Sequence, residues 1–234
     1  MDRGKFYDTI RPMFGGKMKQ SQVDGCERII SACNGLPITW TAYLLATALH
    51  ETASTMLPVR ETLASTDASA VSRLENAWKA GKLKWVKTPY WRFDSSGKTW
   101  LGRGYVQLTH KDNYAKASKL TGVDLLADPN RAMQPEAAAK ILVEGSISGM
   151  FTGKKLADYL PGDYTGARRI INGTDKASLI AGYAKRFEEG LAAARWGEAV
   201  QRPKNVADYL TKPATGGFFN AIAAFLSRLF GGRK

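Results

Sequence analysis

The run Trp-Thr-Ala-Tyr-Leu-Leu-Ala-Thr-Ala-Leu, residues 40–49, is an almost unbroken apolar stretch, and Thr39 stands where it can cap a helix. The pattern predicts a buried helix from Thr39 to about residue 52. Glu51 closes the apolar run, and a second carboxylate follows in His50-Glu51-Thr52-Ala53-Ser54-Thr55-Met56-Leu57-Pro58-Val59-Arg60-Glu61. A helix buried along its length and ending on a carboxylate is the feature from which the rest of the fold is read.

The two carboxylates stand in different sequence settings. Glu51 adjoins the apolar run, so we expect loss of hydration to raise its pKa, whereas Glu61 follows Pro58 and Arg60 and is expected to stay ionised. Two carboxylates whose pKa values are pushed apart suit a general acid and a general base. Glycoside hydrolysis places such a pair across the scissile bond.

Composition limits the classes of protein. The chain has 234 residues, 44% of them hydrophobic, which is enough for a sizeable core. The net charge of +13 indicates either a basic enzyme or attraction to a polyanion, such as nucleic acid, an anionic membrane or an anionic cell wall. Cys26 and Cys33 lie two helical turns apart, about 10 Å, which is too far for a disulfide, so both are expected to be buried thiols.

Most segments carry helical patterns. Further helices are predicted at residues 23–32, 70–81, 111–121, 135–150 and 176–195. Residues 82–103 mix aromatic with Lys, Pro, Asp, Ser and Gly residues and predict a loop or short hairpin. The sequence therefore predicts a mainly α-helical domain over residues 1–197 with one short β/loop segment.

The end of the chain has a different pattern. Residues 198–217 indicate a linker, and residues 218–234 predict a separate cationic amphipathic helix with its Phe, Ile and Leu residues on one face. This helix is too short to span a bilayer and suits an interface, so anionic outer-membrane lipid or lipopolysaccharide is the expected partner. The alternative is a C-terminal helix that docks on the protein's own surface.

Metal binding is not expected. His50-Glu51 begins like a zinc-protease helix, but that motif needs a second His four residues on, where Ser54 stands. The other histidine is His110, at an unrelated spacing. We therefore expect neither a metal nor another cofactor.

Two further motifs carry polar groups. In Gly102-Arg103-Gly104-Tyr105-Val106-Gln107-Leu108-Thr109, the glycines permit a close backbone approach to a ligand, and Gln107 and Thr109 are expected on one face of a short strand. The alternative is a tight turn followed by a buried strand. In Arg168-Arg169-Ile170-Ile171-Asn172-Gly173-Thr174, the alternative is an Asn172-Gly173 turn whose Thr174 or Asp175 caps the next helix.

The ordered set resembles glycoside hydrolase family 19, and within it the lysozyme-like endolysins of phages and prophages of Gram-negative bacteria. The order is His-Glu-Thr, a second Glu, Gly-Arg-Gly-Tyr-Val-Gln-Leu-Thr and Ile-Ile-Asn-Gly, and Asn113-Tyr114, residues 122–126 and Asp128-Pro129 extend it. The resemblance covers about residues 6–195. It implies a mainly α-helical, two-lobed, lysozyme-like fold with the substrate in a cleft.

The resemblance also implies inverting cleavage of a β-1,4 glycosidic bond. Glu51 matches the general acid, Glu61 the second carboxylate, and Thr109 the hydroxyl residue that helps hold the attacking water. The expected substrate-binding residues are His50, Arg103, Tyr105, Gln107, Asn113 and Asn172. The structural alternative for Glu51 is a helix-terminal glutamate paired with Arg60 or Arg103.

The expected function is an N-acetylmuramidase that degrades peptidoglycan during phage lysis. The chain departs from plant chitinases, because its two glutamates are closer in sequence and the plant disulfide cysteines are missing. A chitinase remains the nearest alternative, and a membrane-disrupting or wall-binding protein with a vestigial site is the alternative from another class. We expect a monomer that is made in the host cytoplasm without a signal peptide, acts on the wall in the periplasm after release, and does not bind nucleic acid.

Overall fold

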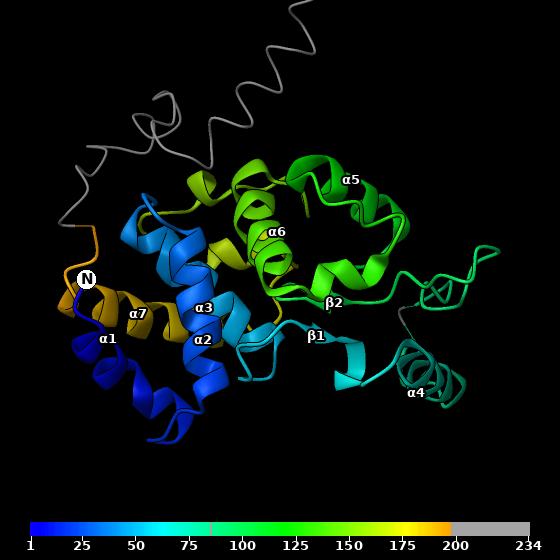
Figure 1. Cartoon of the computed structure of the whole chain (residues 1–234), viewed down its shortest axis with the longest axis horizontal. Coiled ribbons are helices and arrows are strands. Elements are labelled where there is room, and N and C mark those ends of the chain that lie inside the picture. The colour runs from blue at the N-terminus through cyan, green and yellow to red at the C-terminus, as the bar shows by residue number, and fades with distance from the viewer. Residues whose placement is uncertain (85, 198–234) are drawn as a thin grey trace, which may run out of the picture.

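The computed structural model describes residues 1–84 and 86–197, and in this part of the chain helices predominate (Figure 1). The expected mainly α-helical fold is confirmed. The α-helices are α1 (Arg3–Ile10), α2 (Gln20–Ala32), α3 (Ile38–Glu51), α4 (Asp67–Lys79), α5 (Lys111–Thr121), α6 (Pro135–Ser148) and α7 (Ala177–Ala193). The strands are β1 (Val59–Arg60) and β2 (Arg103–Gly104), and the 3₁₀ helices are η1 (Arg11–Phe14), η2 (Glu61–Leu63), η3 (Pro129–Met133), η4 (Leu156–Asp158) and η5 (Gly166–Ile170). The linker and amphipathic helix expected at 198–217 and 218–234 lie outside the described residues.

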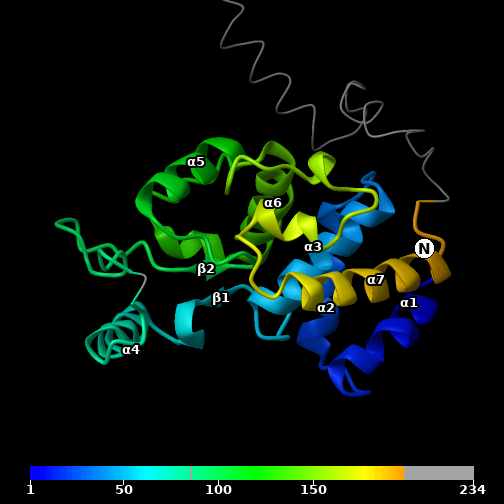
Figure 2. The same cartoon turned by 180° about the vertical axis from the view of Figure 1, so that it is seen from behind.

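Helix α3 is the centre of the larger core. Every residue from Trp40 to Leu49 is buried, as the apolar run predicts. Its main partner is α7, which lies across it in both views (Figures 1 and 2). On the other side of α7, Phe6 and Ile10 of α1 pack against Gly190, where an added Cβ would lie 2.9 Å from Ile10. Burial of α3 on several sides fixes the position of its C-terminal end, where Glu51 lies.

Helices α2, α5 and α6 complete the body of the molecule. Helix α6 contacts both α2 and α5. Nine of its residues are buried, and one of them is a carboxylate, Glu144. The two cysteines are free and buried, as expected.

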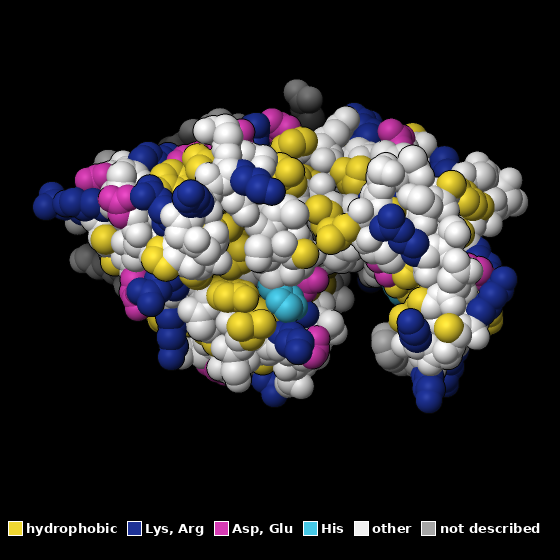
Figure 3. Space-filling model, turned by 90° about the horizontal axis from the view of Figure 1, so that it is seen from below, with side chains coloured by type: hydrophobic (Ala, Val, Ile, Leu, Met, Phe, Trp, Pro, Cys, Tyr) yellow, Lys and Arg dark blue, Asp and Glu magenta, His cyan; other side chains and the backbone are white. Residues whose placement is uncertain are grey.

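A second, smaller hydrophobic cluster lies under α4. Its buried members are Ala64, Ala70, Leu74, Trp91 and Leu101. The loop that was expected at 82–103 supplies Trp91 and Leu101 to this cluster. This aromatic segment therefore packs against α4. The surface is hollowed between this part and the helical body (Figure 3). The two parts are connected through β1 and η2 (Figure 1).

The two strands form one short antiparallel sheet, and residues 61–102 connect them. Val59 pairs with Gly104 and Arg60 with Arg103. The expected strand through Gln107 and Thr109 is wrong: residues 105–107 form a turn, and Leu108 returns to bridge Arg103. The tight turn that was the alternative is present. Among the described residues, no helix is long and apolar enough to cross a membrane.

Candidate active site

Glu51 is bound to a buried arginine. Its Oε1 accepts a hydrogen bond from Arg168 Nη1 at 2.6 Å, and the side chains are 16% and 3% exposed, respectively. Arg168 belongs to η5, which is tied to α3 because Tyr43 Oη donates to the Ala167 carbonyl at 2.7 Å. The expected apolar setting of Glu51 is therefore wrong. The structural alternative named the right kind of partner, an arginine, but the wrong residue.

The arginines of that alternative belong to another ion-pair group. Arg60 Nε and Arg103 Nη2 each donate to a different oxygen of Asp67 at 2.6 Å. Asn130 Oδ1 accepts from both guanidinium groups. This group joins the two-stranded sheet to the start of α4 and to η3, so it fixes the smaller part of the molecule against β1 and β2.

Glu61 is held by neutral donors. Its Oε1 accepts from Tyr90 Oη at 2.6 Å and its Oε2 from the Gly102 amide at 2.7 Å. The Glu61 amide in turn donates to the Gly102 carbonyl at 2.7 Å. The cationic setting expected from Arg60 is absent, because Arg60 points to Asp67 instead. Glu61 is thus oriented by a phenol and a backbone amide. Each of its two oxygens accepts one of these hydrogen bonds and keeps a second lone pair for a water or a sugar hydroxyl.

A side chain at position 102 would displace groups of the site. A Cβ at this position would lie 2.7 Å from Gln107 Oε1 and 3.3 Å from Glu61 Oε2. Gln107 Nε2 donates to the Val59 carbonyl at 3.1 Å, which fixes the amide beside the carboxylate. The structure therefore brings Glu61, Gly102 and Gln107 together. The close backbone approach expected at this glycine is made to the Glu61 side chain.

Tyr90 was not singled out by the sequence. Burial and the negative charge of Glu61 raise the pKa of its phenol, so the phenol stays protonated and remains a donor. Its ring centroid lies 4.7 Å from that of His110 and 5.1 Å from that of Trp91. The aromatic composition of residues 82–103 was visible in the sequence, but nothing in it marked this ring as the partner of Glu61.

Two expected substrate contacts are corrected. Arg103 is fully buried and donates to Asp67, to the carbonyls of Thr99 and Leu101 and to Tyr114 Oη. Tyr105 is 1% exposed and belongs to the larger core. Both side chains are inaccessible to a ligand because they are buried in the interior.

The other expected site residues remain accessible to different degrees. His50, Gln107, Thr109 and Asn113 are half-buried and Asn172 is exposed. Within the described part of the chain, the Thr109 hydroxyl has no hydrogen-bond partner, which leaves it able to hold a water. Asn172 Oδ1 accepts from the Gly173 amide, and the chain bends at residues 172–174, where the alternative had a turn. The expected cap is wrong, because α7 begins after Lys176 with no side-chain cap.

Strained backbone is concentrated around the carboxylates. Nine described non-glycine residues have positive φ, and seven of them flank the site: Ala53, Ser54, Met56, Thr62, Leu63, Gln107 and His110, with φ between 50° and 68°. Such conformations cost about 1–3 kcal/mol each and persist only where the surrounding structure enforces them. The segment from Glu51 to Leu63 and the turn that faces it are therefore held in a shape that local propensity does not favour.

Comparison with known proteins found no matching family model, no matching curated protein and no matching solved structure. Within the described residues, no three His, Cys, Asp or Glu side chains come together in a way that would hold a metal ion.

Proposed function

We propose that this chain is a lysozyme-like glycoside hydrolase of the family 19 type, an endolysin that cleaves the β-1,4 glycosidic bonds of peptidoglycan with inversion. The observation that carries the proposal is the pair of partly exposed carboxylates in contrasting settings. Glu51 faces a guanidinium and Glu61 faces a phenol and an amide. The strained segment that joins them and the adjoining hollow support a site rather than a surface, and a two-lobed arrangement with the glycan in the hollow follows from the proposal.

In the proposed reaction, Glu51 first takes up a proton, in competition with its ion pair to Arg168, and then protonates the leaving oxygen while Glu61 removes a proton from the attacking water. Arg168 is placed to stabilise the carboxylate that Glu51 becomes once its proton has left. Tyr90 and Gly102 fix the direction of the Glu61 lone pairs, and the unpartnered Thr109 hydroxyl helps to hold the water. An inverting pair needs about 6.5–9.5 Å between its carboxyl groups to admit that water.

The substrate test is mass spectrometry of peptidoglycan digested with the full chain. A muramidase leaves N-acetylmuramic acid at the new reducing end, and this is the expected product. A new N-acetylglucosamine end would replace the muramidase assignment with a glucosaminidase. Release of soluble oligomers from chitin but not from peptidoglycan would instead make the chain a chitinase.

The C-terminal segment bears on where the enzyme acts. The proposal assigns residues 218–234 to anionic outer-membrane lipid or lipopolysaccharide, because apolar residues gather on one helical face and the end is cationic. Deletion of residues 214–234 is expected to preserve lysis of outer-membrane-stripped cells and to reduce killing of whole Gram-negative cells. Loss of folding in the truncated chain, or unchanged whole-cell killing, would refute this assignment.

A further inference from the structure

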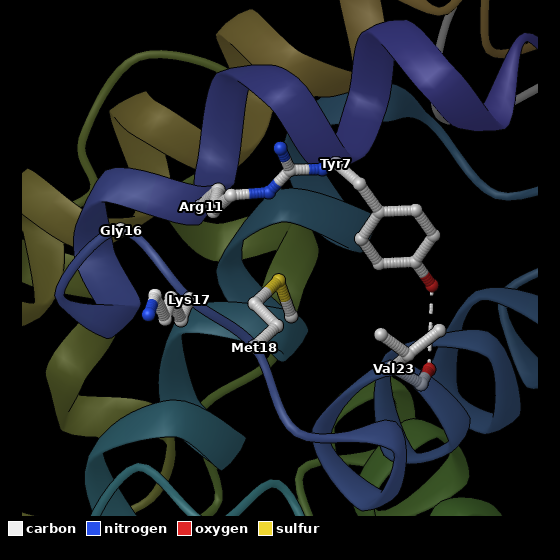
Figure 4. A pocket seen from close by; sticks show the side chains of 6 residues that line it. All are labelled: Tyr7, Arg11, Gly16, Lys17, Met18 and Val23. Atoms are coloured by element: carbon white, nitrogen blue, oxygen red, sulfur yellow. Dashed lines mark hydrogen bonds between the residues drawn. The ribbon is translucent and has the colours of Figure 1, made fainter.

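A pocket outside the candidate active site opens between α1, η1 and the start of α2. Its volume is about 510 Å³, within the range of small-ligand sites. The residues that line it are Tyr7, Arg11, Gly16, Lys17, Met18 and Val23 (Figure 4).

The pocket is formed by a tight reversal of the chain. Gly15 and Gly16 take left-handed conformations, with φ of 71° and 83°, and their amides donate to carbonyls of η1. The chain then returns along α1 to begin α2. Tyr7 Oη donates to the Val23 carbonyl at 3.3 Å (Figure 4). It also lies 2.8 Å from Glu27 Oε1, and these contacts hold the two walls together.

Two cations on the rim are available to an anion. Arg11 pairs with Asp8 at 3.1 Å, but these side chains are 47% and 71% exposed, and such surface pairs are worth about 0–1 kcal/mol. Lys17 is exposed and has no ion-pair partner in the described part of the chain. The carboxylate on the opposite wall, Glu27, is already bound to Arg3 and Tyr7. The rim is therefore positive, while Met18, Val23 and the Tyr7 ring provide an apolar floor.

The wall formed by α2 rests directly on the segment that follows Glu51. Gln22 Nε2 donates to the Ser54 carbonyl at 2.8 Å. At Gly25 the helix meets this segment so closely that an added Cβ would lie 1.8 Å from the Met56 carbonyl oxygen. A ligand in the pocket and a glycan at Glu51 would thus be held on one continuous structural unit.

We propose that this pocket binds a short acidic peptide that carries free carboxylates and small apolar side chains. Arg11 and Lys17 would take the carboxylates, and the apolar floor would take methyl groups. Resting on the proposed function, the source of this peptide is the peptide arm of peptidoglycan, whose alanine residues and free carboxylates have this chemistry. The enzyme would then grip the peptide arm on one face of α2 while the glycan lies at the active site.

The first test is direct binding by isothermal titration calorimetry with the full chain. The probes are a synthetic stem pentapeptide containing γ-linked glutamate and diaminopimelate, an unrelated peptide Asp-Ala-Ala, and an uncharged tri-alanine amide. We expect the pentapeptide to bind and the R11Q/K17Q variant to bind it at least tenfold more weakly. K116Q/K119Q is the matched control, because it removes two exposed charges from α5. An equal loss of affinity in both variants, or no binding of the pentapeptide to the wild type, would overturn the proposal that this pocket binds peptide.

The probes separate the sources of the ligand. Preference for the pentapeptide over Asp-Ala-Ala supports the peptidoglycan arm, whereas equal binding would reduce the inference to a general acidic-peptide site and would refute the named source. Binding of the tri-alanine amide as tight as that of the pentapeptide would contradict the role of the two cations.

The second test is kinetic and keeps the two proposals distinct. On intact sacculi, R11Q/K17Q is expected to raise KM several-fold with kcat nearly unchanged, and on glycan strands freed of peptide it should match the wild type. An equal defect on both substrates would overturn the inference, since the peptide would then be irrelevant. If the wild type cleaves neither substrate, the proposed hydrolase fails, while the calorimetry still decides whether the pocket binds peptide.

Discussion

Glu51 and Glu61 are the same residue in two differently built settings. Glu51 ends a buried helix and meets a guanidinium that comes from 117 positions further along the chain. Glu61 lies in a strained segment between a two-residue strand and a helix, and meets a phenol 29 positions and an amide 41 positions away. One carboxylate has a full positive charge beside it, and the other has only dipoles.

The difference separates charge compensation from orientation. A buried arginine loses much of its hydration, so the charge of Arg168 needs the carboxylate of Glu51 to compensate it. Glu61 has no charged partner of this kind. Neutral donors fix direction at little electrostatic cost. Substitution at Glu51 should therefore affect both stability and activity, whereas substitution at Glu61 should affect mainly activity.

Glu51→Gln is expected to have the largest effect on activity. A positioned acid or base contributes about 10²–10⁴ in rate, and the variant should lose nearly all wall degradation while staying folded. Turbidity loss of outer-membrane-stripped cells measures it, with circular dichroism as the check on folding. A rate like that of the wild type would refute the acid assignment and would favour a binding protein with a vestigial site.

Glu61→Gln should also be severely impaired, by about 10² or more, and Thr109→Ala less so. A carboxylate that accepts a proton is harder to replace than a hydroxyl that orients a water. Glycosides with activated leaving groups distinguish the roles, because they need no acid: they should restore turnover to Glu51→Gln but not to Glu61→Gln. The reverse pattern would exchange the two assignments.

Arg168→Met tests the charged pair. Breaking a fully buried pair costs about 3–5 kcal/mol, and we expect about 2–3 kcal/mol because water can reach the partly exposed Glu51. Urea unfolding at pH 7 measures it. The double variant with Glu51→Gln should lose less free energy of unfolding than the two single variants lose together. Simple additivity would mean that the pair is not coupled.

Glu144 provides a third carboxylate for the comparison, one that accepts no hydrogen bond from the described residues. Neither of its oxygens has a hydrogen bond within the described residues, and burial, opposed by Lys140, raises its pKa from 4.5 to about 7. Between these values the unfolded chain is ionised and the folded one is not, so stability falls as pH rises from 4.5 to 7.

Glu144→Gln should therefore raise Tm relative to the wild type at pH 8 and change it little at pH 4. The expected gain is a few degrees, at about 2–4 °C per kcal/mol for a chain of this size. Differential scanning calorimetry at both pH values measures it. The exposed Glu189→Gln serves as the control, and the same gain at pH 4 and pH 8 would argue against titration of Glu144.

Tyr90→Phe is expected to reduce activity less than Glu61→Gln does. It removes one hydrogen bond to Glu61, worth about 1.5–3 kcal/mol when the acceptor is charged, and leaves the amide of Gly102 in place. The rate should fall by about tenfold with KM nearly unchanged, and the pH profile should change on the limb that reports the base. An unchanged rate would mean that Gly102 alone orients Glu61.

Local pattern was enough for most of the helices. The helix expected at 111–121 coincides with α5, and those expected at 135–150 and 176–195 differ from α6 and α7 by two residues or fewer at each end. Helix α1 was not predicted, because only Phe6 and Ile10 are buried in it and its apolar stripe is too short to recognise. The strand expected through Gln107 failed because the alternation there comes from a turn with a positive φ at Gln107.

The sequence by itself determined that residues 40–49 are buried and that a carboxylate closes that helix, because a run of apolar residues leaves water whatever it packs against. Only the tertiary structure decided that Glu51 binds Arg168, that Glu61 binds Tyr90 and Gly102, and that Arg103 is interior. Hydrogen bonds, including those within these ion pairs, need donor and acceptor atoms about 3 Å apart. Their partners therefore depend on how distant elements are packed together, which no local periodicity records.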